Sequence, residues 1–246
     1  MKKSTLLPLL MIAMAACNHR SNSLANDNSN NTGHSATQLT GTYQGTLPCA
    51  DCPGMDYQVS LYDDHTFSEL VAYQGRGQDI ATVASGTWQQ TSDSTVMLKK
   101  KTDSSSFLAS EGKLLLLDPN GKRIEGVLAS NFELKAIAVG DRRPMLAEKA
   151  KAGIRFTANG NQPGWRLDLD HKMIYFHATN GDSLQVALPA PQPNTDTLKV
   201  YTTPDITISI RNIMCSDDIS GLMRPNTVQV QVKDKNYQGC GEYIGQ

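Results

Sequence analysis

The sequence predicts an all-β protein built from two antiparallel β-domains. Apolar and polar residues alternate with a period of two through most of the chain, as in residues 57–61, 66–73 and 228–232. Clusters of Asp, Asn, Gly and Ser interrupt these runs at intervals of roughly 8–12 residues, the spacing of turns between short strands. Only residues 145–152 favour a helix outside the N-terminal leader. Many short strands with frequent turns favour an antiparallel barrel or sandwich.

The expected strands fall into two groups separated by a change in composition at residues 139–144. The first group reads as one domain at about 39–137, and the second as another at about 153–246. Residues 138–152, which contain the short helical stretch, are the expected connector. The expected strands are 57–61, 66–73, 83–88, 96–98, 114–117 and 132–134, then 154–158, 165–169, 173–176, 206–210 and 228–232.

Turn chemistry marks two loops within this plan. Residues 118–122, DPNGK, contain Asn-Gly, a strong hairpin signal before Ile124. The interval 189–194, PAPQPN, is rich in proline, which cannot donate a ladder hydrogen bond. We therefore expect a hairpin at the first position and a surface loop at the second.

Residues 1–17 read as a cleaved export signal. Two lysines precede a short apolar stretch, and two alanines stand directly before Cys17. That arrangement resembles the lipobox of bacterial lipoproteins, which implies that Cys17 is lipidated and becomes the first residue of the mature chain. Asn18 in place of Asp implies, by the rule of enteric bacteria, transfer to the outer membrane facing the periplasm. Residues 18–38, rich in Asn, Ser and Thr, are the expected disordered tether.

Composition excludes several classes of function. Without the two lysines of the leader, 21 basic residues stand against 24 acidic ones, so nucleic acid is not an expected partner. The chain has no Gly-x-Ser-x-Gly elbow, no phosphate-binding glycine loop and no His-Glu-x-x-His motif. Its five histidines are scattered along the sequence. We therefore expect a binding or sensing protein and not an enzyme; the histidines are His19, His34, His65, His171 and His177.

Four cysteines remain once Cys17 is set aside, and an even number in an oxidising compartment predicts paired disulfides. Cys49 and Cys52 lie in the stretch LPCADCPG. A four-residue turn brings its ends within the reach of a disulfide. Two thiolates at this spacing can instead hold one soft cation, copper(I) above all. A redox catalyst is disfavoured because no helix follows to lower the thiol pKa, but the disulfide and the copper(I) site both stay open.

The run 41–55, GTYQGTLPCADCPGM, with LYDDHTF at 61–67 and GTW at 86–88, resembles the N-terminal domain of the NlpE (CutF) copper-homeostasis lipoproteins. The resemblance extends to about residue 136, with Met55 in place of the family's usual Ile. It implies a small lipocalin-like β-barrel on an outer-membrane lipoprotein linked to copper resistance and envelope stress signalling. Cys49 and Cys52 are then candidate copper(I) ligands, and an envelope stress sensor protein is the implied partner.

The second domain departs from the NlpE proteins of enteric bacteria, whose C-terminal part is an OB-fold-like module. Residues 156–165, 215–223 and 239–241 look like a module of uncharacterised bacterial envelope lipoproteins. Cys215 and Cys240 are expected to form a disulfide between two strands, with a stabilisation of roughly 3 kcal/mol from chain entropy. Trp165 is expected in the core. Asp217 and Asp218 are adjacent, which makes a poor catalytic pair and favours a loop.

Two alternatives to copper handling and stress sensing remain open. A lipocalin-like barrel could carry an apolar ligand in its interior. The second domain could act as an inhibitor or docking module, with the Cys49–Cys52 turn purely structural. A wide apolar cavity inside the barrel would favour the carrier, whereas a filled interior with accessible sulfur atoms would favour the sensor.

Overall fold

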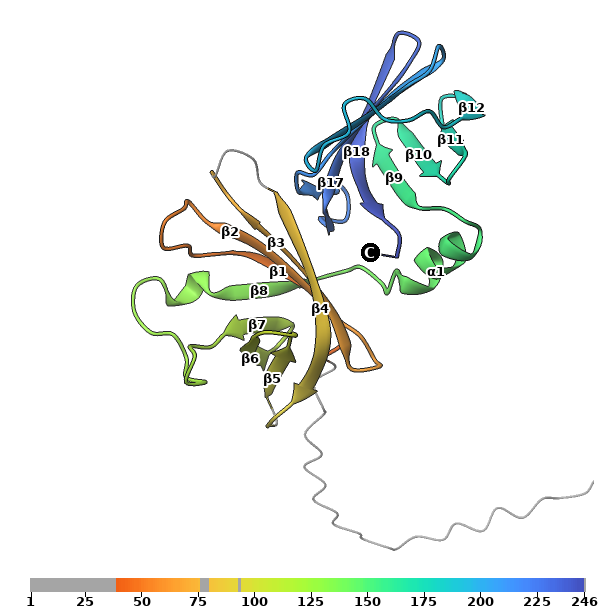
Figure 1. The fold of residues 1–246 in the computed structure, drawn as a ribbon. Helices are drawn as coiled ribbons and strands as arrows, with labels where there is room; N and C mark the ends of the chain where they lie inside the picture. The colour runs from red at the N-terminus through yellow and green to blue at the C-terminus, as the bar shows by residue number, and fades with distance from the viewer. Residues whose placement is uncertain (1–38, 76–79, 93, 246) are drawn as a thin grey trace, which may run out of the picture. The chain divides into compact units, whose positions relative to one another are not determined.

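The computed structural model describes residues 39–75, 80–92 and 94–245. The described chain is almost entirely β, which confirms the all-β prediction (Figure 1). Its one α-helix, α1 (Arg143–Lys151), lies in the expected connector. No helix in the described part of the chain is long and apolar enough to cross a membrane. The predicted signal, the tether and Cys17 lie outside the described residues, as do His19 and His34.

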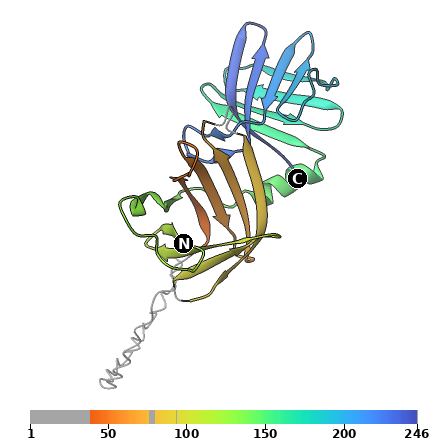
Figure 2. The same cartoon turned by 60° about the vertical axis from the view of Figure 1, so that its left-hand side comes forward.

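The first domain is a closed eight-stranded barrel in which each strand pairs antiparallel with the next (Figures 1 and 2). β1 closes it by pairing with β8, from Thr42 opposite Ile137 to Gln44 opposite Lys135. The strands are β1 (Gly41–Leu47), β2 (Met55–Leu61), β3 (Thr66–Tyr73), β4 (Ala81–Gln90), β5 (Thr95–Lys99), β6 (Ser104–Ser110), β7 (Lys113–Leu116) and β8 (Glu133–Ile137).

Side chains from all eight strands fill the barrel. Alternation places every second residue inside, and these residues form one buried cluster that includes Tyr43, Val59, Phe67, Trp88, Leu98, Phe107, Leu114 and Leu134. Gly86 allows β4 to approach β5 closely, since a Cβ there would lie 2.1 Å from the backbone oxygen of Lys99. The interior is a packed core.

One ion pair lies inside this core. Glu69 is 3% exposed, accepts a hydrogen bond from the Tyr57 hydroxyl, and lies 3.0 Å from Nζ of Lys100. Burial, followed by the charge of Glu69, raises the pKa of Tyr57, so the phenol stays a neutral donor. Lys100 reaches this carboxylate from the end of β5. A buried carboxylate without these partners would be strongly destabilising.

The second domain is one curled antiparallel sheet with the strand order β12-β11-β10-β9-β18-β17-β14-β13. A two-residue pair, β15 (Cys215–Ser216) with β16 (Met223–Arg224), accompanies it. The sheet strands are β9 (Phe156–Asn161), β10 (Gly164–Leu169), β11 (Met173–Ala178), β12 (Ser183–Ala187), β13 (Leu198–Thr202), β14 (Ile206–Arg211), β17 (Asn226–Val232) and β18 (Lys235–Tyr243).

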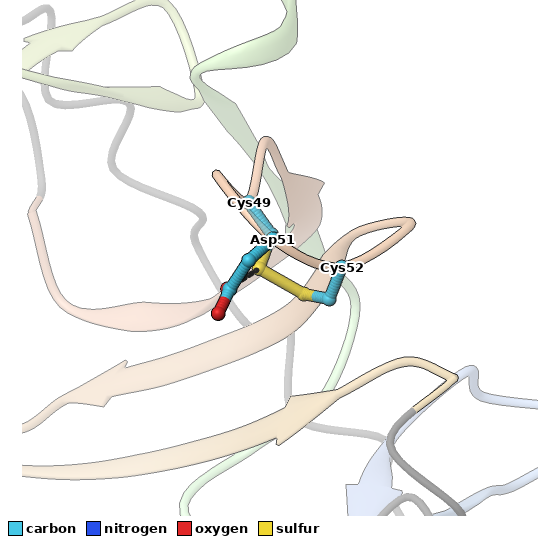
Figure 3. A group of neighbouring side chains, drawn as sticks. All are labelled: Cys49, Asp51 and Cys52. Atoms are coloured by element: carbon cyan, nitrogen blue, oxygen red, sulfur yellow. Dashed lines mark hydrogen bonds between the residues drawn. A yellow bond between two sulfur atoms is a disulfide. The ribbon is translucent and has the colours of Figure 1, made fainter.

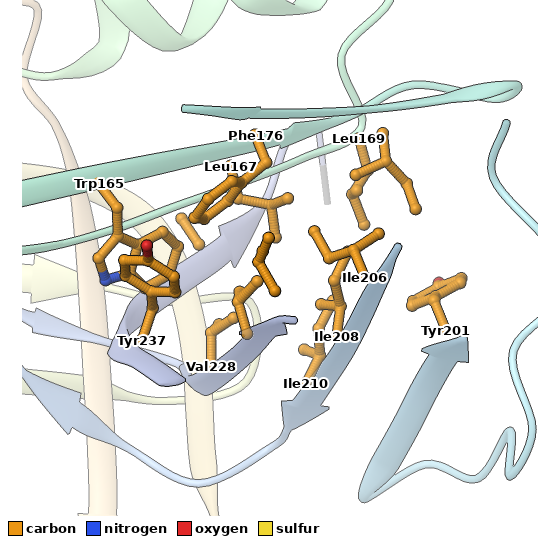
Figure 4. Packing of buried hydrophobic residues seen from close by; sticks show 14 of the residues in the cluster. Trp165, Leu167, Leu169, Phe176, Tyr201, Ile206, Ile208, Ile210, Val228 and Tyr237 are labelled. Atoms are coloured by element: carbon orange, nitrogen blue, oxygen red, sulfur yellow. The ribbon is translucent and has the colours of Figure 1, made fainter. Parts of the chain in front are cut away.

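The concave side of this sheet holds the core of the second domain (Figure 4). Trp165 packs there at 6.0 Å from Phe176 and 6.4 Å from Tyr237, measured between ring centroids. Its Nε1 donates to the backbone oxygen of Gln238 at 3.0 Å. Trp165 is therefore a core residue with its polar atom satisfied, as predicted from its place beside a turn.

The structure differs from the sequence prediction at several strands. The hairpin expected at 118–122 contains a single bridge, Leu117 with Arg123, and the barrel closes with β8 from Glu133. Asp118 accepts backbone hydrogen bonds from Asn120 and Lys122, which closes a local turn without a ladder. β1, β6, β12, β13 and β18 are absent from the predicted strands. β1, β6 and β18 are polar or rich in Ser or Gly, and β12 and β13 are only five residues long.

The Pro-rich interval 189–194 is a loop, as expected, and it also covers a sheet edge. The backbone N–H of Gln192 donates to Val200 at 2.7 Å, and that of Val200 donates to Pro193 at 3.1 Å. These bonds use the outer side of β13, which has no strand neighbour there in the described sheet. The loop therefore shields an edge that would otherwise be open to another chain.

Candidate functional site

Cys49 and Cys52 form a disulfide in the turn between β1 and β2 (Figure 3). Their Cα atoms are 5.3 Å apart, and only three positions separate them in sequence. Both cysteines are half-buried, while Ala50 and Asp51 between them are exposed. The sulfur atoms thus lie at the surface of the barrel, on a turn that presents them to solvent.

Neighbouring elements hold this turn in place. The backbone N–H of Gln74, just after β3, donates to the oxygen of Gly54 at 2.9 Å, and its side-chain amide donates to Asp56 at 2.9 Å. Thr46 at the end of β1 donates to the same carboxylate at 2.7 Å. A Cβ on Gly54 would lie 2.7 Å from the Thr46 methyl, so glycine permits this close approach. The turn is fixed from three strands.

Each sulfur atom has an oxygen beside it. Sγ of Cys49 is 3.6 Å from Oδ1 of Asp51, and Sγ of Cys52 is 3.2 Å from the backbone oxygen of Gly54. A disulfide sulfur carries no hydrogen, so these contacts become hydrogen bonds only when the pair is reduced and each thiol can donate. The turn therefore offers the dithiol two acceptors that the disulfide cannot use.

The same three side chains could form a metal site after reduction. One ligand atom from each of Cys49, Asp51 and Cys52 lies within 4.8 Å of the others. Within the described ranges this is the one group of three or more His, Cys, Asp or Glu residues that is so arranged. Two thiolates are the soft ligands that copper(I) prefers. In the disulfide form the sulfur atoms are bonded to each other, so metal binding requires reduction first.

The local structure argues against a thioredoxin-type catalyst. The residues after Cys52 turn into β2, and no helix begins at either cysteine. A helix N-terminus is the usual device for lowering the pKa of a catalytic thiol. The carboxylate of Asp51 near Cys49 acts in the opposite direction, because a negative charge disfavours a thiolate.

The filled barrel leaves the apolar-carrier hypothesis without structural support. The inner positions carry large, fully buried side chains, among them Leu47, Leu61, Phe67, Leu98, Phe107 and Leu114. This is the packed arrangement that favours a sensor over a carrier.

In the second domain, Cys215 on β15 is bonded to Cys240 on β18, with Cα atoms 5.4 Å apart. Asp217 and Asp218 follow in the loop before β16. Oδ1 of Asp217 accepts backbone hydrogen bonds from Ile219 and Ser220 at 3.2 and 2.8 Å. These contacts hold the loop together. The aspartates have a structural role, in keeping with their predicted place in a loop.

The described histidines have structural or surface positions. His65 lies in the turn before β3 and packs on Trp88 with ring centroids 4.9 Å apart. His171 accepts a hydrogen bond from Nε of Arg155 at 2.8 Å. His177 is exposed on β11. None of the three lies in the group formed by the first cysteine pair.

Sequence reasoning singled out both cysteines of the site but missed the residue that braces it. Gln74 is 22 positions after Cys52 and belongs to no motif. Only the β2–β3 register, which places Met55 opposite Tyr73, brings Gln74 beside the turn. The pairing could have been anticipated from a β2–β3 hairpin, but the hydrogen bonds of its amide could not.

Comparison with known proteins agrees with this architecture. Residues 43–127 match the family model described as the NlpE N-terminal domain. The matched residues lie within the barrel domain. The Lipoprotein NlpE of Escherichia coli (strain K12) is 34% identical over 96 residues, which cover 39% of this chain and 40% of that protein. The 17 kDa lipoprotein of Treponema pallidum (strain Nichols) is 31% identical over 100 residues, which cover 40% of this chain and 64% of that protein.

The chain matches less than two thirds of the length of either lipoprotein. The crystal structure of the Cpx pathway activator NlpE from Escherichia coli covers 85% of this chain and 97% of its own. Its sequence identity is 16% and its TM-score is 0.33. The resemblance to the NlpE N-terminal domain therefore rests on the barrel domain, whose sequence match includes the Cys49–Cys52 turn.

Proposed function

We propose that this chain is a lipid-anchored protein of the bacterial envelope that binds copper(I) through Cys49 and Cys52. It serves copper homeostasis and resistance, and it reports envelope stress to a sensor protein. It acts by binding and not as an enzyme. Cys17 carries the lipid, and the anchor places the protein in the outer membrane, facing the periplasm.

The observation that carries the copper proposal is the cluster of donor atoms at the surface turn. Two sulfur atoms and a carboxylate gather within 4.8 Å on a turn held by hydrogen bonds from β1 and from the end of β3. A site already held in shape loses little conformational entropy on binding. Reduction supplies the two thiolates, and their softness selects copper(I) over harder cations.

The signalling part of the proposal rests on the relatives. Two of them are named lipoproteins, and the NlpE of known structure from Escherichia coli is described as the Cpx pathway activator. An activator of a signalling pathway acts on a sensor protein, and a lipid-anchored chain shares the membrane surface with such a sensor. The barrel domain is the part of this chain that the sequence match covers.

A competition titration with a chromogenic copper(I) chelator tests the metal site. A soluble form that lacks residues 1–17 is fully reduced and compared with a Cys49→Ser/Cys52→Ser variant. We expect the wild type to withdraw one more copper(I) than the variant at submicromolar free metal. The matched control, Cys215→Ala/Cys240→Ala, removes as many cysteines from the other domain and should leave this copper(I) bound.

The role of Asp51 distinguishes copper(I) from a harder cation. A carboxylate is a poor ligand for soft copper(I) but a good one for zinc(II). We expect Asp51→Asn to change copper(I) affinity by less than about threefold and to weaken zinc(II) more strongly. If the cysteine variant and the wild type withdraw equal copper, the turn is structural and the proposal is wrong.

Lipid attachment has a separate test. In a bacterial host that processes lipoproteins, the wild-type chain should fractionate with outer membranes, and Cys17→Ser should abolish that. Mass spectrometry of the N-terminal peptide would show the acyl chains on Cys17. A wild-type chain recovered without acyl groups would contradict the anchor.

A further inference from the structure

Strand direction places several connections at the same end of the barrel as the disulfide. β1 runs toward the Cys49–Cys52 turn, and in an antiparallel barrel every second connection returns to that end. These are the turns 48–54, 100–103 and 117–132, with the described flanks of the β3–β4 connection. We call this region the disulfide end. The chain enters at Leu39 and leaves after Ile137 at the opposite end, where Thr42 pairs with Ile137.

Direct contacts bring two neighbouring segments against the cysteine turn and the strand that leads to it. Gln74 donates to Gly54, and a Cβ on Gly75 would lie 3.0 Å from the Pro53 ring. On the other side, β8 lies against the last residues of β1, because a Cβ on Gly45 would be 2.5 Å from the backbone oxygen of Glu133. The turn 117–132 therefore ends beside the strand that leads to Cys49.

Strand direction also places four exposed apolar side chains on connections at this end. Among the described residues seven large apolar side chains are exposed, and four of them lie here. Val127 is 99% exposed and Leu128 is 56% exposed on the turn before β8. Tyr73 and Ile80 flank the β3–β4 connection, each 43% exposed. Single exposed apolar residues are ordinary, but their grouping at one end of a domain is typical of an interaction surface.

The charges around these residues balance. The turns 48–54, 100–103 and 117–132 contain four acidic and four basic residues, namely Asp51, Asp103, Asp118 and Glu125 with Lys100, Lys101, Lys122 and Arg123. A surface for anionic lipid would need a basic excess. Apolar residues with a polar rim of mixed charge are the pattern of a protein–protein interface.

We propose that the disulfide end is the docking face for a protein dithiol that reduces the Cys49–Cys52 bond. The inference rests on the proposed function, since copper(I) binding requires the reduced pair. The partner is identified by what the face presents: a disulfide at the surface beside exposed apolar residues. A partner bearing a reactive cysteine within an apolar surface would cover Val127 and Leu128 while its thiolate reaches Cys49.

The chemistry is a thiol–disulfide exchange in two steps. A partner thiolate attacks Sγ of Cys49, the Cys49–Cys52 bond breaks, and Cys52 leaves as a thiolate. Cys52 takes a proton from solvent, and the new thiol donates a hydrogen bond to the oxygen of Gly54. The second partner thiolate then attacks the partner sulfur of the mixed disulfide. Cys49 leaves as a thiolate, takes a proton from solvent, and donates a hydrogen bond to Asp51. Two electrons pass from the partner to this chain, and the partner becomes the disulfide.

The position of Asp51 favours attack at Cys49 over attack at Cys52. Its carboxylate lies beside Cys49, 3.6 Å from the sulfur. When Cys49 is attacked, the charge of the leaving thiolate develops on Cys52, where the neighbouring oxygen belongs to the neutral backbone of Gly54. Attack at Cys52 would instead leave a thiolate next to a carboxylate.

The test compares a protein dithiol with a small one. The oxidised mature chain is treated with reduced thioredoxin, as the probe protein dithiol, or with dithiothreitol. Differential alkylation and mass spectrometry follow the Cys49–Cys52 peptide, separately from the Cys215–Cys240 pair. We expect Val127→Asp/Leu128→Asp to slow reduction by thioredoxin at least about tenfold, equivalent to about 1.4 kcal/mol of lost docking energy. Reduction by dithiothreitol should not change.

A control is Ile219→Asp, which puts one such negative charge on an exposed apolar position of the second domain. It should be reduced by thioredoxin as fast as the wild type. Equal thioredoxin rates for the wild type and the Val127→Asp/Leu128→Asp variant would overturn the proposal. In another outcome, the wild type self-associates or binds phosphatidylglycerol vesicles, and the variant loses that property. Such a result would assign the face to another occupant and would also overturn the proposal.

Failure of this inference can be told apart from failure of the copper proposal. Chemically reduced wild type and Val127→Asp/Leu128→Asp should take up copper(I) equally, because the variant leaves both cysteines in place. That titration reports on the metal site alone. The thioredoxin rates report on the docking face alone, whatever the metal result.

Discussion

Removing the disulfide of the second domain should cost far more stability than removing that of the barrel turn. The Cys215–Cys240 bond closes a loop with a sequence separation of 25, and the Cys49–Cys52 bond one of 3. The chain-entropy relation then gives roughly 3.5 kcal/mol for the larger loop and about 2 kcal/mol for the smaller one. We expect Cys215→Ala/Cys240→Ala to lower the free energy of unfolding of the second domain by about 3.5 kcal/mol.

The chain offers a built-in assay, because it has two tryptophans and each domain buries one. In a Trp88→Phe background, fluorescence follows the second domain through Trp165. In a Trp165→Phe background, it follows the barrel through Trp88. At a urea slope of about 1.5 kcal/mol/M, the loss corresponds to a midpoint lowered by about 2 M. The shift should appear in the Trp165 transition, with the Trp88 transition unchanged.

The reasoning would be refuted by an equal shift in both transitions, or by no shift in the Trp165 transition. The matched experiment, Cys49→Ala/Cys52→Ala, should move only the Trp88 transition, and by no more than about 2 kcal/mol. A larger loss in the Trp88 transition would mean that the barrel needs its small disulfide to stay folded. A copper site that forms only after this disulfide is reduced would then unfold its own domain.

Three further predictions concern the barrel. Gly86→Ala should destabilise the barrel by about 1–3 kcal/mol, as overpacking a core does, because the new Cβ meets backbone. Gly140→Ala, with open space around it, should leave the urea midpoint of Trp88 fluorescence unchanged. Lys100→Met should cost about 2 kcal/mol in the same assay, since Glu69 would lose its cation, and adding Glu69→Gln should recover part of the loss. Hydrogen bonds from Thr66, and then from Arg143, lower the pKa of Asp64 to about 2. The stabilising effect of the carboxylate is therefore complete above pH about 4 and is lost as the pH falls through 2. Urea midpoints of Asp64→Asn and the wild type should differ at pH 7 and converge as the pH falls below 2.

Much of the barrel could be predicted from the sequence, because its strands alternate. The run from Thr66 to Tyr73 has Phe67, Val71 and Tyr73 on one face and becomes β3 as expected. The same alternation puts Glu69 inside, which no local pattern explains. Its partners come from β2 and from the end of β5, so only the closed barrel shows that the charge is paired.

The second domain was harder to predict at its closing strand. β18 has the sequence KNYQGCGEY, with two glycines and little alternation, and reads as a loop. In the sheet it lies between β9 and β17, and the glycines allow the close approach: a Cβ on Gly239 would lie 2.1 Å from the backbone oxygen of Asn159. The residues that look least like a strand thus form one at the centre of the sheet.

The cysteine turn was likewise only partly predictable from the sequence. The spacing of Cys49 and Cys52 and the turn between prolines were readable from the sequence. The acceptor beside each sulfur, the bracing by Gln74 and the apolar residues of the disulfide end depend on strand register and direction. Val127 and Leu128 are 75 or more positions from Cys52 and are brought to the same end only by the order of eight strands.

The barrel's first and last strands leave it at one end, where Thr42 pairs with Ile137. Both chain attachments therefore emerge side by side, and the cysteine turn lies at the other end of the same strands. A different module could follow Ile137 without moving any atom around Cys49. Such a barrel is a transferable module: the domain that follows it can be replaced while the thiol chemistry stays intact.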